Sequence, residues 1–339
     1  MNKCKHIYFE SARKATIGEH TLSPLQRGQA LVRVAYSLTS PGTELAFFEG
    51  THSSIREGKT TYPLGVGGST GYSSVGIIEK ADDGLKDFAP GDRVVVFAGH
   101  ASRHLVTADI LYHVPDGVPD EQAVFAILGS IALHGVRETK PAYGEVALVQ
   151  GLGAIGQIAV RLLRLAPLRT IIAVDAYPLR LEAAQQGGAD VTLDIRDTDI
   201  VKTVRDITAG RGCEIVVEAS GSVKAIPPAL KSAANRGRVM ILGCPHGETA
   251  LDLYSELQKK ELSLIGSYQP NCPNFETPYM PWTQRRNREL ILEYLRQKRI
   301  DFSTLLTHRR PYTDAQEVYN ALSVEKAKAL CGLFDWRDV

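Results

Sequence analysis

The stretch Glu145-Val146-Ala147-Leu148-Val149-Gln150-Gly151-Leu152-Gly153-Ala154-Ile155-Gly156-Gln157-Ile158-Ala159-Val160 decides the fold of this chain. Its apolar first part predicts a buried parallel strand, and the apolar residues that recur with helical spacing in its second part predict a helix. A Gly-x-Gly-x-x-Gly turn joins the two. Gly151 permits a tight turn, Gly153 lets another group approach the backbone closely, and Gly156 lets the helix pack close to its strand.

The context of this turn predicts a dinucleotide site. The apolar run 170–174 predicts a second buried strand and ends on Asp175, 22 residues after Gly153, where a Rossmann fold places the acid that binds the adenosine ribose hydroxyls. Backbone N–H groups at Ala154 and Ile155 would receive the phosphates at the positive end of the helix. No Arg or Lys follows Asp175 directly and its carboxylate repels a 2′-phosphate, so NAD is favoured over NADP. The alternative is a structural glycine turn in another kind of α/β protein. The expected cofactor contacts further along the chain are Arg180, Ser220 and Gly243.

The composition limits the classes of protein to consider. A chain of 339 residues is long enough for two domains, and 39 basic residues balance 38 acidic ones, which argues against nucleic acid or an anionic membrane as a partner. The first six residues lack the apolar core of a signal peptide and no apolar run reaches membrane-spanning length, so we expect a cytoplasmic protein. Five scattered cysteines, without a Cys-x-x-Cys pair, argue for reduced thiols and against a cysteine-built zinc site.

Residues 1–125 predict a different architecture from that of the glycine turn. Short strands separated by turns are typical of a small β-barrel. Two polar loops, 39–44 and 65–73, lie between the strands, and the glycines of the second loop permit close approach of another group. The predicted strands are 30–36, 75–79 and 93–97.

Several motifs, together with the strand-rich start and the glycine turn, resemble the medium-chain dehydrogenase/reductase superfamily. They are Gly91-Asp92-Arg93-Val94, Val114-Pro115-Asp116-Gly117-Val118, Gly187-Gly188-Ala189-Asp190, Cys213–Gly221 and Gly237–Gly243. The resemblance implies an α/β protein with a GroES-like β-barrel catalytic domain, at 1–125 and 298–339, and a Rossmann NAD-binding domain with a doubly wound parallel sheet, at 126–297. It also implies a homodimer or homotetramer.

The sequence departs from the zinc-dependent members of that family at each ligand position. Their Cys-Gly-Thr-Asp signature corresponds to Pro41-Gly42-Thr43-Glu44, their Gly-His-Glu to Gly71-Tyr72-Ser73, and their third ligand to Ile127. Proline and isoleucine cannot bind zinc, and neutral hydroxyl groups are poor zinc ligands. The four-cysteine lobe of the structural zinc is also absent from the sequence. We therefore expect no metal at either zinc position.

Without zinc, side chains must handle the proton of the substrate. Thr43 matches the family hydroxyl that hydrogen-bonds the substrate alcohol, although a turn threonine could equally cap local backbone. Tyr72 fills the old ligand position and could bind the substrate oxygen or only fill space. Glu44 could orient its neighbours or pair with a buried arginine. His100, expected on one strand face with His104, is the candidate general base, with a satisfied polar or surface histidine as the alternative.

Three further positions are candidates for substrate contact. Phe97 matches a pocket-lining aromatic residue of the family. The segment 268–282 is rich in proline, asparagine and aromatic residues, which suits a carbohydrate face, and its continuation resembles sugar and glycoside dehydrogenases of this superfamily. Trp282 and Arg286 are therefore expected to contact substrate, with a subunit-contact loop as the alternative.

These features predict a zinc-independent, NAD-dependent oxidoreductase that moves a hydride between the cofactor and a secondary alcohol or its ketone. The expected substrate is a small polar molecule such as a sugar, glycoside or cyclitol. One alternative is a zinc-free double-bond reductase of the quinone or enoyl type. A second is an alcohol dehydrogenase for tetrapyrrole side chains, whose Gly-Thr-Glu and Gly-Tyr variants are similar. A third is a cofactor-binding protein that has lost catalysis together with zinc.

Overall fold

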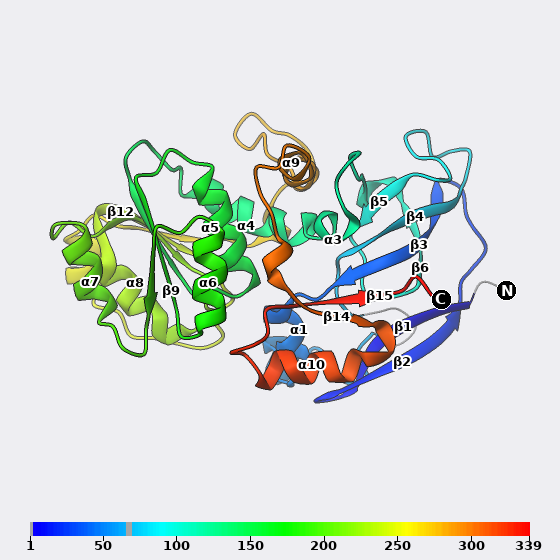
Figure 1. Cartoon of the computed structure of the whole chain (residues 1–339), viewed down its shortest axis with the longest axis horizontal. Helices are drawn as coiled ribbons and strands as arrows, with labels where there is room; N and C mark the ends of the chain where they lie inside the picture. The colour runs from blue at the N-terminus through cyan, green and yellow to red at the C-terminus, as the bar shows by residue number, and fades with distance from the viewer. Residues whose placement is uncertain (1–2, 66–69) are drawn as a thin grey trace. The chain divides into compact units, whose positions relative to one another are not determined.

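The computed structural model describes residues 3–65 and 70–339, and the chain divides into two compact units (Figure 1). The strand-rich unit contains Met1–Ile127, Arg288–Lys298 and Phe302–Val339. The parallel-sheet unit contains Leu128–Asn287 and Arg299–Asp301. The contacts thus group Arg288–Lys298 with the strand-rich unit, whereas the sequence led us to expect the parallel-sheet domain to run as far as residue 297.

The parallel-sheet unit has six strands in the order β10-β9-β8-β11-β12-β13, and each adjacent pair is parallel. Counted from β8, this is the order 3-2-1-4-5-6 of the doubly wound dinucleotide-binding fold, which confirms the predicted fold class. The strands are β8 (Val146–Gln150), β9 (Thr170–Asp175), β10 (Val191–Asp194), β11 (Cys213–Glu218), β12 (Ala233–Ile241) and β13 (Ser263–Gly266). The helices are α4 (Ala126–Glu138), most of which belongs to this unit, α5 (Ala154–Arg164), α6 (Pro178–Gln186), α7 (Ile200–Ile207) and α8 (Ile226–Ser232).

Helices cover both faces of this sheet. All five residues of β8 are buried, because a central parallel strand with helices on both faces has no side that meets water. One core cluster joins the strands to α7 and α8 through residues such as Val204 and Leu230, while α5 and α6 contact β8 and β9. Figure 1 shows α5 and α6 on one side of the strands and α7 and α8 on the other.

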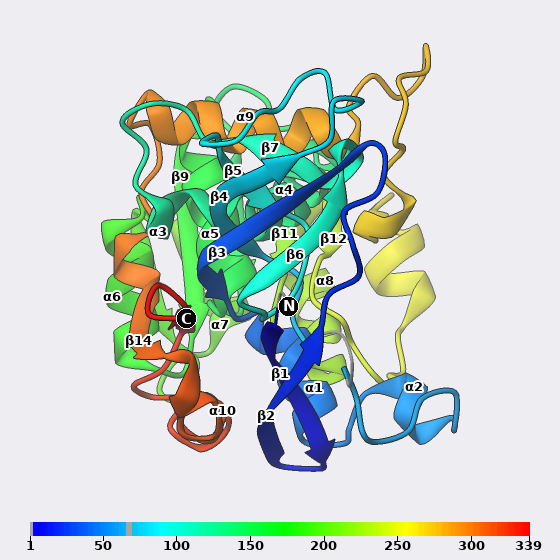
Figure 2. The same cartoon turned by 90° about the vertical axis from the view of Figure 1, so that its right-hand side faces the viewer.

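The strand-rich unit is built on a seven-stranded sheet in the order β14-β15-β3-β4-β5-β7, with β6 also paired to β3. β3 pairs with β6 through residues 29–33 and with β15 through residues 36–38, so a late strand completes a sheet that begins early in the chain. β1 and β2 form a separate antiparallel ribbon (Figure 2). The strands are β1 (Lys3–Ser11), β2 (Lys14–Thr21), β3 (Gln29–Leu38), β4 (Ser74–Ala81), β5 (Arg93–Val96), β6 (Arg103–Thr107), β7 (Leu111–His113), β14 (Leu306–Pro311) and β15 (Cys331–Asp335). The helices are α1 (Pro41–Phe48), α2 (Ser53–Arg56), α3 (Asp120–Ala123), α9 (Gln284–Arg296), most of which belongs to this unit, and α10 (Ala315–Val324).

One predicted loop of this unit is in fact a helix. Pro41 opens α1, because a proline at the first helical position needs no partner for a missing N–H and its fixed φ suits a helix. Thr43 and Glu44 therefore lie on α1 instead of in a polar loop, and Glu44 is buried. Of the second predicted loop, 65–73, residues 66–69 lie outside the described residues.

In the part of the chain that the structure describes, every helix is too short or too polar to cross a lipid bilayer. The cytoplasmic location expected from the sequence stays a prediction.

Candidate functional site

In the glycine turn after β8, a side chain would clash with neighbouring backbone at two of the three glycines, and the third has free space beside it. Gly151 has a φ of +86°, and a Cβ atom there would lie 2.5 Å from the backbone nitrogen of Ser220. At Gly156, a Cβ atom would lie 1.9 Å from the carbonyl oxygen of Gly151. At Gly153, by contrast, nothing beyond its chain neighbours lies within 4 Å of the Cβ position. A second group therefore has room to approach the backbone at Gly153.

The first turn of α5 suits an anion. Gly153 is the N-cap residue, and no side-chain hydrogen bond caps this end of the helix. The N–H groups of Ala154 and Ile155 belong to the first turn, where the helix dipole is positive and backbone donors lack partners within the helix. These residues fit the pyrophosphate of a dinucleotide, since such helix ends bind phosphate groups.

Asp175 is the last residue of β9, and both oxygens of its carboxylate accept hydrogen bonds from backbone N–H groups. Its Oδ2 accepts a hydrogen bond from the N–H of Leu152 at 2.7 Å, and its Oδ1 accepts from Ala176 and Tyr177 at 2.8 and 3.1 Å. A guanidinium nitrogen of Arg180 lies 3.7 Å from Oδ2. The carboxylate thus ties the end of β9 to the glycine turn, a role that spacing alone does not reveal. Since a carboxylate accepts about four hydrogen bonds, capacity is left for a ligand hydroxyl.

Ser220 and Gly243 follow the ends of β11 and β12 and lie close to neighbouring backbone. Ser220 contacts Gly151, and a Cβ atom on Gly243 would lie 2.5 Å from the backbone nitrogen of Gly221. Backbone turns therefore pack together at the carboxyl edge of the sheet, which is where open α/β folds bind ligands. The predicted cofactor contacts that this one unit holds are Gly151, Gly153, Ala154, Ile155, Gly156, Asp175, Arg180, Ser220 and Gly243.

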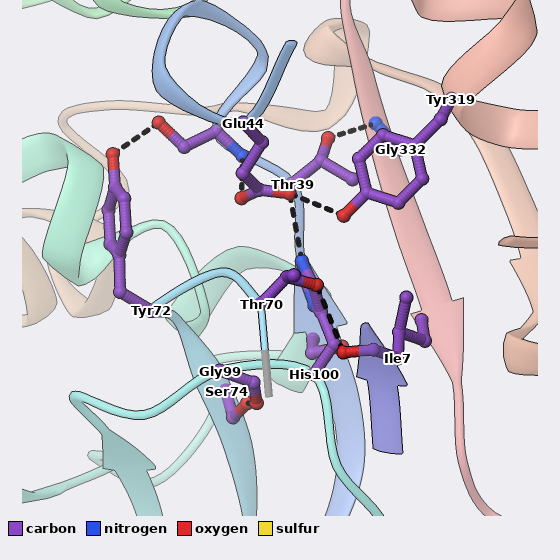
Figure 3. A network of polar contacts seen from close by, with 12 residues as sticks. Ile7, Thr39, Glu44, Thr70, Tyr72, Ser74, Gly99, His100, Tyr319 and Gly332 are labelled. Atoms are coloured by element: carbon purple, nitrogen blue, oxygen red, sulfur yellow. Dashed lines mark hydrogen bonds and ion pairs between the residues drawn. The ribbon is translucent and has the colours of Figure 1, made fainter. Parts of the chain in front are cut away.

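A buried polar network surrounds Glu44 in the strand-rich unit (Figure 3). Oε2 of Glu44 lies 3.0 Å from Nε2 of His100 and accepts a hydrogen bond from the hydroxyl of Tyr319 at 2.6 Å. Oε1 of Glu44 accepts from the N–H of Ser40 at 2.6 Å. Burial and the nearby carboxylate raise the pKa of Tyr319 well above its ordinary value, so its hydroxyl stays a donor. Glu44 therefore orients its neighbours, and its partners are a histidine and a tyrosine instead of the arginine considered from the sequence.

The surroundings of His100 do not suit a base that meets substrate. Its side chain is fully buried, and its two ring nitrogens face Glu44 and, at 2.8 Å, Oγ of Ser37. The indole N–H of Trp336 donates to the same Oγ at 2.8 Å. The expectation that His100 and His104 share a strand face is wrong, because β6 begins only at Arg103 and His100 lies in the loop before it. His100 links α1, β3 and the end of the chain.

Thr43, Glu44 and Tyr72 line one pocket of about 280 Å³ in the strand-rich unit. The hydroxyl of Tyr72 is hydrogen-bonded to the hydroxyl of Ser40, and the ring centroids of Tyr72 and Phe97 lie 6.1 Å apart. The structure thus gathers the two candidate hydroxyls, Thr43 and Tyr72, at one cavity, with Phe97 beside it. The other residues that line the pocket are Phe9, Phe47, Thr60, Leu64, Gly65, Thr70 and Gly71.

The positions that correspond to the family's catalytic zinc ligands carry side chains that do not fit zinc. Pro41 is the first residue of α1, Ile127 is buried, and the hydroxyl of Tyr72 is bonded to Ser40. Within residues 3–65 and 70–339, no group of three or more His, Cys, Asp or Glu side chains is arranged to hold a metal ion. Neutral hydroxyls and aliphatic side chains are not the nitrogen, sulfur and carboxylate donors that zinc sites use.

Trp282 and Arg286 contact each other, and their contacts stabilise the segment that leads into α9. The guanidinium of Arg137 lies 3.6 Å from the Trp282 ring centroid, and that of Arg286 lies 4.4 Å from it. Arg286 also donates to the carbonyl of Pro281 at 2.6 Å and pairs with Glu276 at 3.1 Å. Cation–π contacts of this kind stabilise a ring by about 0.5–2 kcal/mol. Both candidates therefore have structural partners, whatever they do for substrate.

Sequence reasoning missed three residues around these candidates. Ser40 holds Tyr72, and Tyr319 holds Glu44 from α10. Arg288 is buried, with its guanidinium 4.5 Å from the ring centroid of Phe97. The helical spacing of α9 and α10 predicts packing faces, but it gives no signal for which polar groups those faces meet, so these partners could not be found from the sequence.

Comparison with known proteins gives concordant matches. Residues 154–285 match the family described as "Zinc-binding dehydrogenase". The chain is 25% identical to D-guloside 3-dehydrogenase of Escherichia coli strain K12 over 334 residues, which cover 93% of this chain and 95% of that protein. It is 31% identical to L-threonine 3-dehydrogenase of Bacillus subtilis strain 168 over 218 residues, 64% of this chain and 59% of that protein. A crystal structure with NADH, of an E. coli CFT073 protein described as a short chain alcohol dehydrogenase, has a TM-score of 0.82 at 18% identity, covering 99% of this chain and 100% of that one.

The fold, the glycine turn and these matches show that the chain belongs to the medium-chain dehydrogenase/reductase superfamily. Within that superfamily it is an oxidoreductase of the alcohol dehydrogenase type.

Proposed function

We propose that this protein is a zinc-independent, NAD-dependent dehydrogenase that interconverts a secondary alcohol and a ketone on a sugar, glycoside or cyclitol. The observation that carries the proposal is a pocket lined by the hydroxyls of Thr43 and Tyr72, in a chain whose glycine turn is tied to the acid at the end of the next strand. Similarity along 93% of the chain to a protein named D-guloside 3-dehydrogenase supports a glycoside-like substrate.

The choice of NAD rests on Asp175. Its carboxylate would accept a hydrogen bond from the adenosine ribose and would repel a 2′-phosphate. Arg180 lies beside it, with its guanidinium 4.8 Å from the ring centroid of Tyr177. A bound nicotinamide ring supplies the acceptor or donor of the hydride. Fluorescence titration of the purified protein should give a Kd for NADH at least about tenfold lower than for NADPH. Equal or tighter binding of NADPH would reject this choice.

Zinc independence rests on the donor set of the strand-rich unit. The match to the zinc-binding dehydrogenase family spans residues 154–285, and the three corresponding ligand positions, Pro41, Tyr72 and Ile127, all lie outside it. That match therefore describes the nucleotide-binding part of the chain and does not bear on the catalytic metal.

Thr43 and Tyr72 take the place of zinc at the substrate oxygen. When a hydride leaves the carbinol carbon, the attached oxygen must give up its proton, and a hydrogen-bonded hydroxyl can relay it by passing its own proton to the next hydroxyl and finally to water. The paired hydroxyls of Tyr72 and Ser40 offer such a relay from the pocket. Glu44 and His100 act differently, since they hold α1, which carries Thr43. Glu44 also lines the pocket, but both of its carboxylate oxygens already have protein partners.

The deciding experiment measures NADH formation from NAD with a panel of sugars, glycosides and cyclitols, with and without a strong chelator. We expect turnover of at least one polyhydroxylated substrate, the same rate with chelator, and a metal content far below one zinc per chain by elemental analysis. Loss of activity with chelator and its return with zinc would overturn the zinc-free assignment. Activity only in NAD(P)H-dependent reduction of quinones or enones would favour the double-bond reductase alternative, and NADH binding without any turnover would favour a protein that has lost catalysis.

The proposal that the protein forms a homo-oligomer is based on one edge of the parallel-sheet unit. β13 ends the six-stranded order, so one of its sides has no partner strand among the described residues. Exposed apolar and aromatic side chains gather near it in the sequence, and such patches mark interaction surfaces. They are Leu253, Tyr254, Leu264, Tyr268, Phe275 and Tyr279. Light scattering should therefore show a dimer or tetramer, and Leu264→Glu should shift it toward monomer. A monomeric wild-type protein would reject this part of the proposal.

A further inference from the structure

Glu218 is a buried acid that the proposed mechanism does not use. It is the last residue of β11, its exposed fraction is 0%, and its register partners are Gln150 on β8 and Ile241 on β12. Its Oε1 accepts hydrogen bonds from the N–H of Ser220, at 2.8 Å, and from the Ser220 hydroxyl. The side chain thus reaches forward to the turn that follows its own strand.

Two oxygen atoms at this edge are buried without a hydrogen-bond partner among the described residues. They are Oε2 of Glu218 and Oε1 of Gln150. Because the two residues are directly opposite each other on parallel strands, their side chains lie on the same side of the sheet. A buried polar atom without a partner destabilises the fold, so this arrangement needs an explanation. A neutral carboxylic acid provides one, since its O–H is a donor and the Gln150 oxygen is an acceptor.

The surroundings of Glu218 favour the neutral acid. Burial raises the pKa of its carboxyl above the ordinary value, against hydrogen bonds from Ser220 and Gly221 that lower it. A neutral acid still accepts through Oε1, so the bonds to Ser220 persist. It also adds no negative charge beneath the turn that we propose binds a pyrophosphate.

Ser220 transmits the position of Glu218 to the glycine turn. A Cβ atom on Gly151 would lie 2.5 Å from both the nitrogen and the Cα of Ser220, so the two backbones are in direct contact. The N–H of Ala219 donates to the carbonyl of Gln150 at 2.8 Å, and the N–H groups of Leu242 and Gly243 donate to the carbonyl of Glu218. A shift of Ser220 would therefore move Gly151 and, with it, the start of the phosphate-binding turn.

We propose that Glu218, held as a neutral acid whose proton is directed to Gln150, is a positioning residue that sets the affinity for the dinucleotide by fixing Ser220 against the glycine turn. This proposal rests on the nucleotide site proposed above. Glu218 does not contact the cofactor, and it acts through the backbone of Ser220 and Gly151.

The test compares NADH affinity, by fluorescence titration, with thermal stability. Glu218→Gln keeps an uncharged acceptor for Ser220 and a donor for Gln150, so we expect a Kd within about threefold of wild type. Glu218→Leu has neither, so we expect a Kd raised about tenfold or more. A matched control is Glu214→Leu, because Glu214 lies on the same strand and accepts from the N–H of Val146 at 2.8 Å, at the opposite end of β8. This control should lower thermal stability and leave the Kd unchanged.

Each outcome bears on the proposal. An unchanged Kd in Glu218→Leu, with a loss of stability like that of the control, would reduce Glu218 to a structural residue. A Kd for Glu218→Gln as weak as that of Glu218→Leu would overturn the neutral-acid assignment. Where Glu218→Leu does not fold, Ser220→Ala removes one of the same hydrogen bonds, and we expect it to weaken NADH binding about threefold at nearly native stability. A wild-type protein that binds neither NADH nor NADPH would instead reject the proposed function.

Discussion

Oε2 of Glu44 lies 3.0 Å from Nε2 of His100, and both side chains are buried. The two residues come from α1 and from the loop before β6, and Tyr319 joins them from α10. Because a buried carboxylate is stable only with such partners, the pair fixes α1 on the sheet. The histidine that the sequence predicts as a base is thus a buried partner of the helix that carries Thr43.

This pairing predicts that His100→Ala has a large effect on the free energy of unfolding and a small effect on the turnover rate. Removal of one partner leaves Glu44 buried with fewer hydrogen bonds, and the free energy of unfolding should fall by about 3 kcal/mol. Turnover per folded molecule should stay within about tenfold of wild type. Urea unfolding and steady-state assays on the same preparation check both. A fully stable variant with turnover reduced a thousandfold would restore His100 as a catalytic base.

The pocket predicts a different outcome for Thr43→Val and Tyr72→Phe. Each removes a hydroxyl with little change in side-chain shape, so stability and NADH binding should be nearly unchanged while kcat falls about 10–100-fold. Tyr143→Phe is the matched control, because Tyr143 is 92% exposed and its hydroxyl should be dispensable. Wild-type kcat in both pocket variants would exclude these hydroxyls from the proton relay.

The glycine turn predicts that alanine at Gly153 weakens NADH binding alone, whereas alanine at Gly156 also lowers stability. In Gly153→Ala the new methyl group has no protein atom within 4 Å beyond its chain neighbours, so the variant should unfold like wild type. It should bind NADH at least about tenfold more weakly, since the methyl group occupies the approach of the pyrophosphate. In Gly156→Ala the methyl group would press on the carbonyl of Gly151, so stability should fall as well. Calorimetry and NADH titration separate the two effects. Unchanged NADH affinity in Gly153→Ala would argue against phosphate binding at this turn.

Two histidines of the strand-rich unit lead us to expect that the folded protein loses stability at acidic pH. Burial, followed by the nearby His20, lowers the pKa of His6, and burial lowers the pKa of His104 from 6.5 to about 4. Both groups are therefore neutral in the folded protein at neutral pH. Because the unfolded chain takes up protons near pH 6.5 and the folded chain does not, their contribution to stability is complete above pH 6.5 and is lost as the pH falls toward about 4.

Urea midpoints measured across that interval check this expectation. They should fall steadily between about pH 6.5 and about pH 4, and His104→Gln, which keeps a donor for the carbonyl of Gly99, should fall less steeply. An equal pH dependence in that variant would assign the acid sensitivity to other groups.

The sequence predicts well those parts of the fold whose structure depends on residues close together in the chain. The apolar run of β8, the glycines that follow and the helical spacing of α5 lie within about 20 residues, so local conformational preference and periodicity are sufficient. Pro41-Gly42 misled because the same pair suits a turn and the first turn of a helix. The helix formed since its residues Glu44 and Phe48 are buried, which a local pattern does not show.

By itself the sequence determined the doubly wound sheet, the glycine turn after β8 and the place of Asp175 at the end of β9, because these depend on residue spacing along a single strand–turn–helix unit and the strand after it. Only the tertiary structure decided what the polar side chains touch. Tyr319 reaches Glu44 across 275 residues, and His100 is buried against Ser37 across 63, so no periodicity could pair them. The physical reason is that burial and hydrogen bonding are properties of neighbours in space, and they decide whether a histidine reacts or only holds a helix in place.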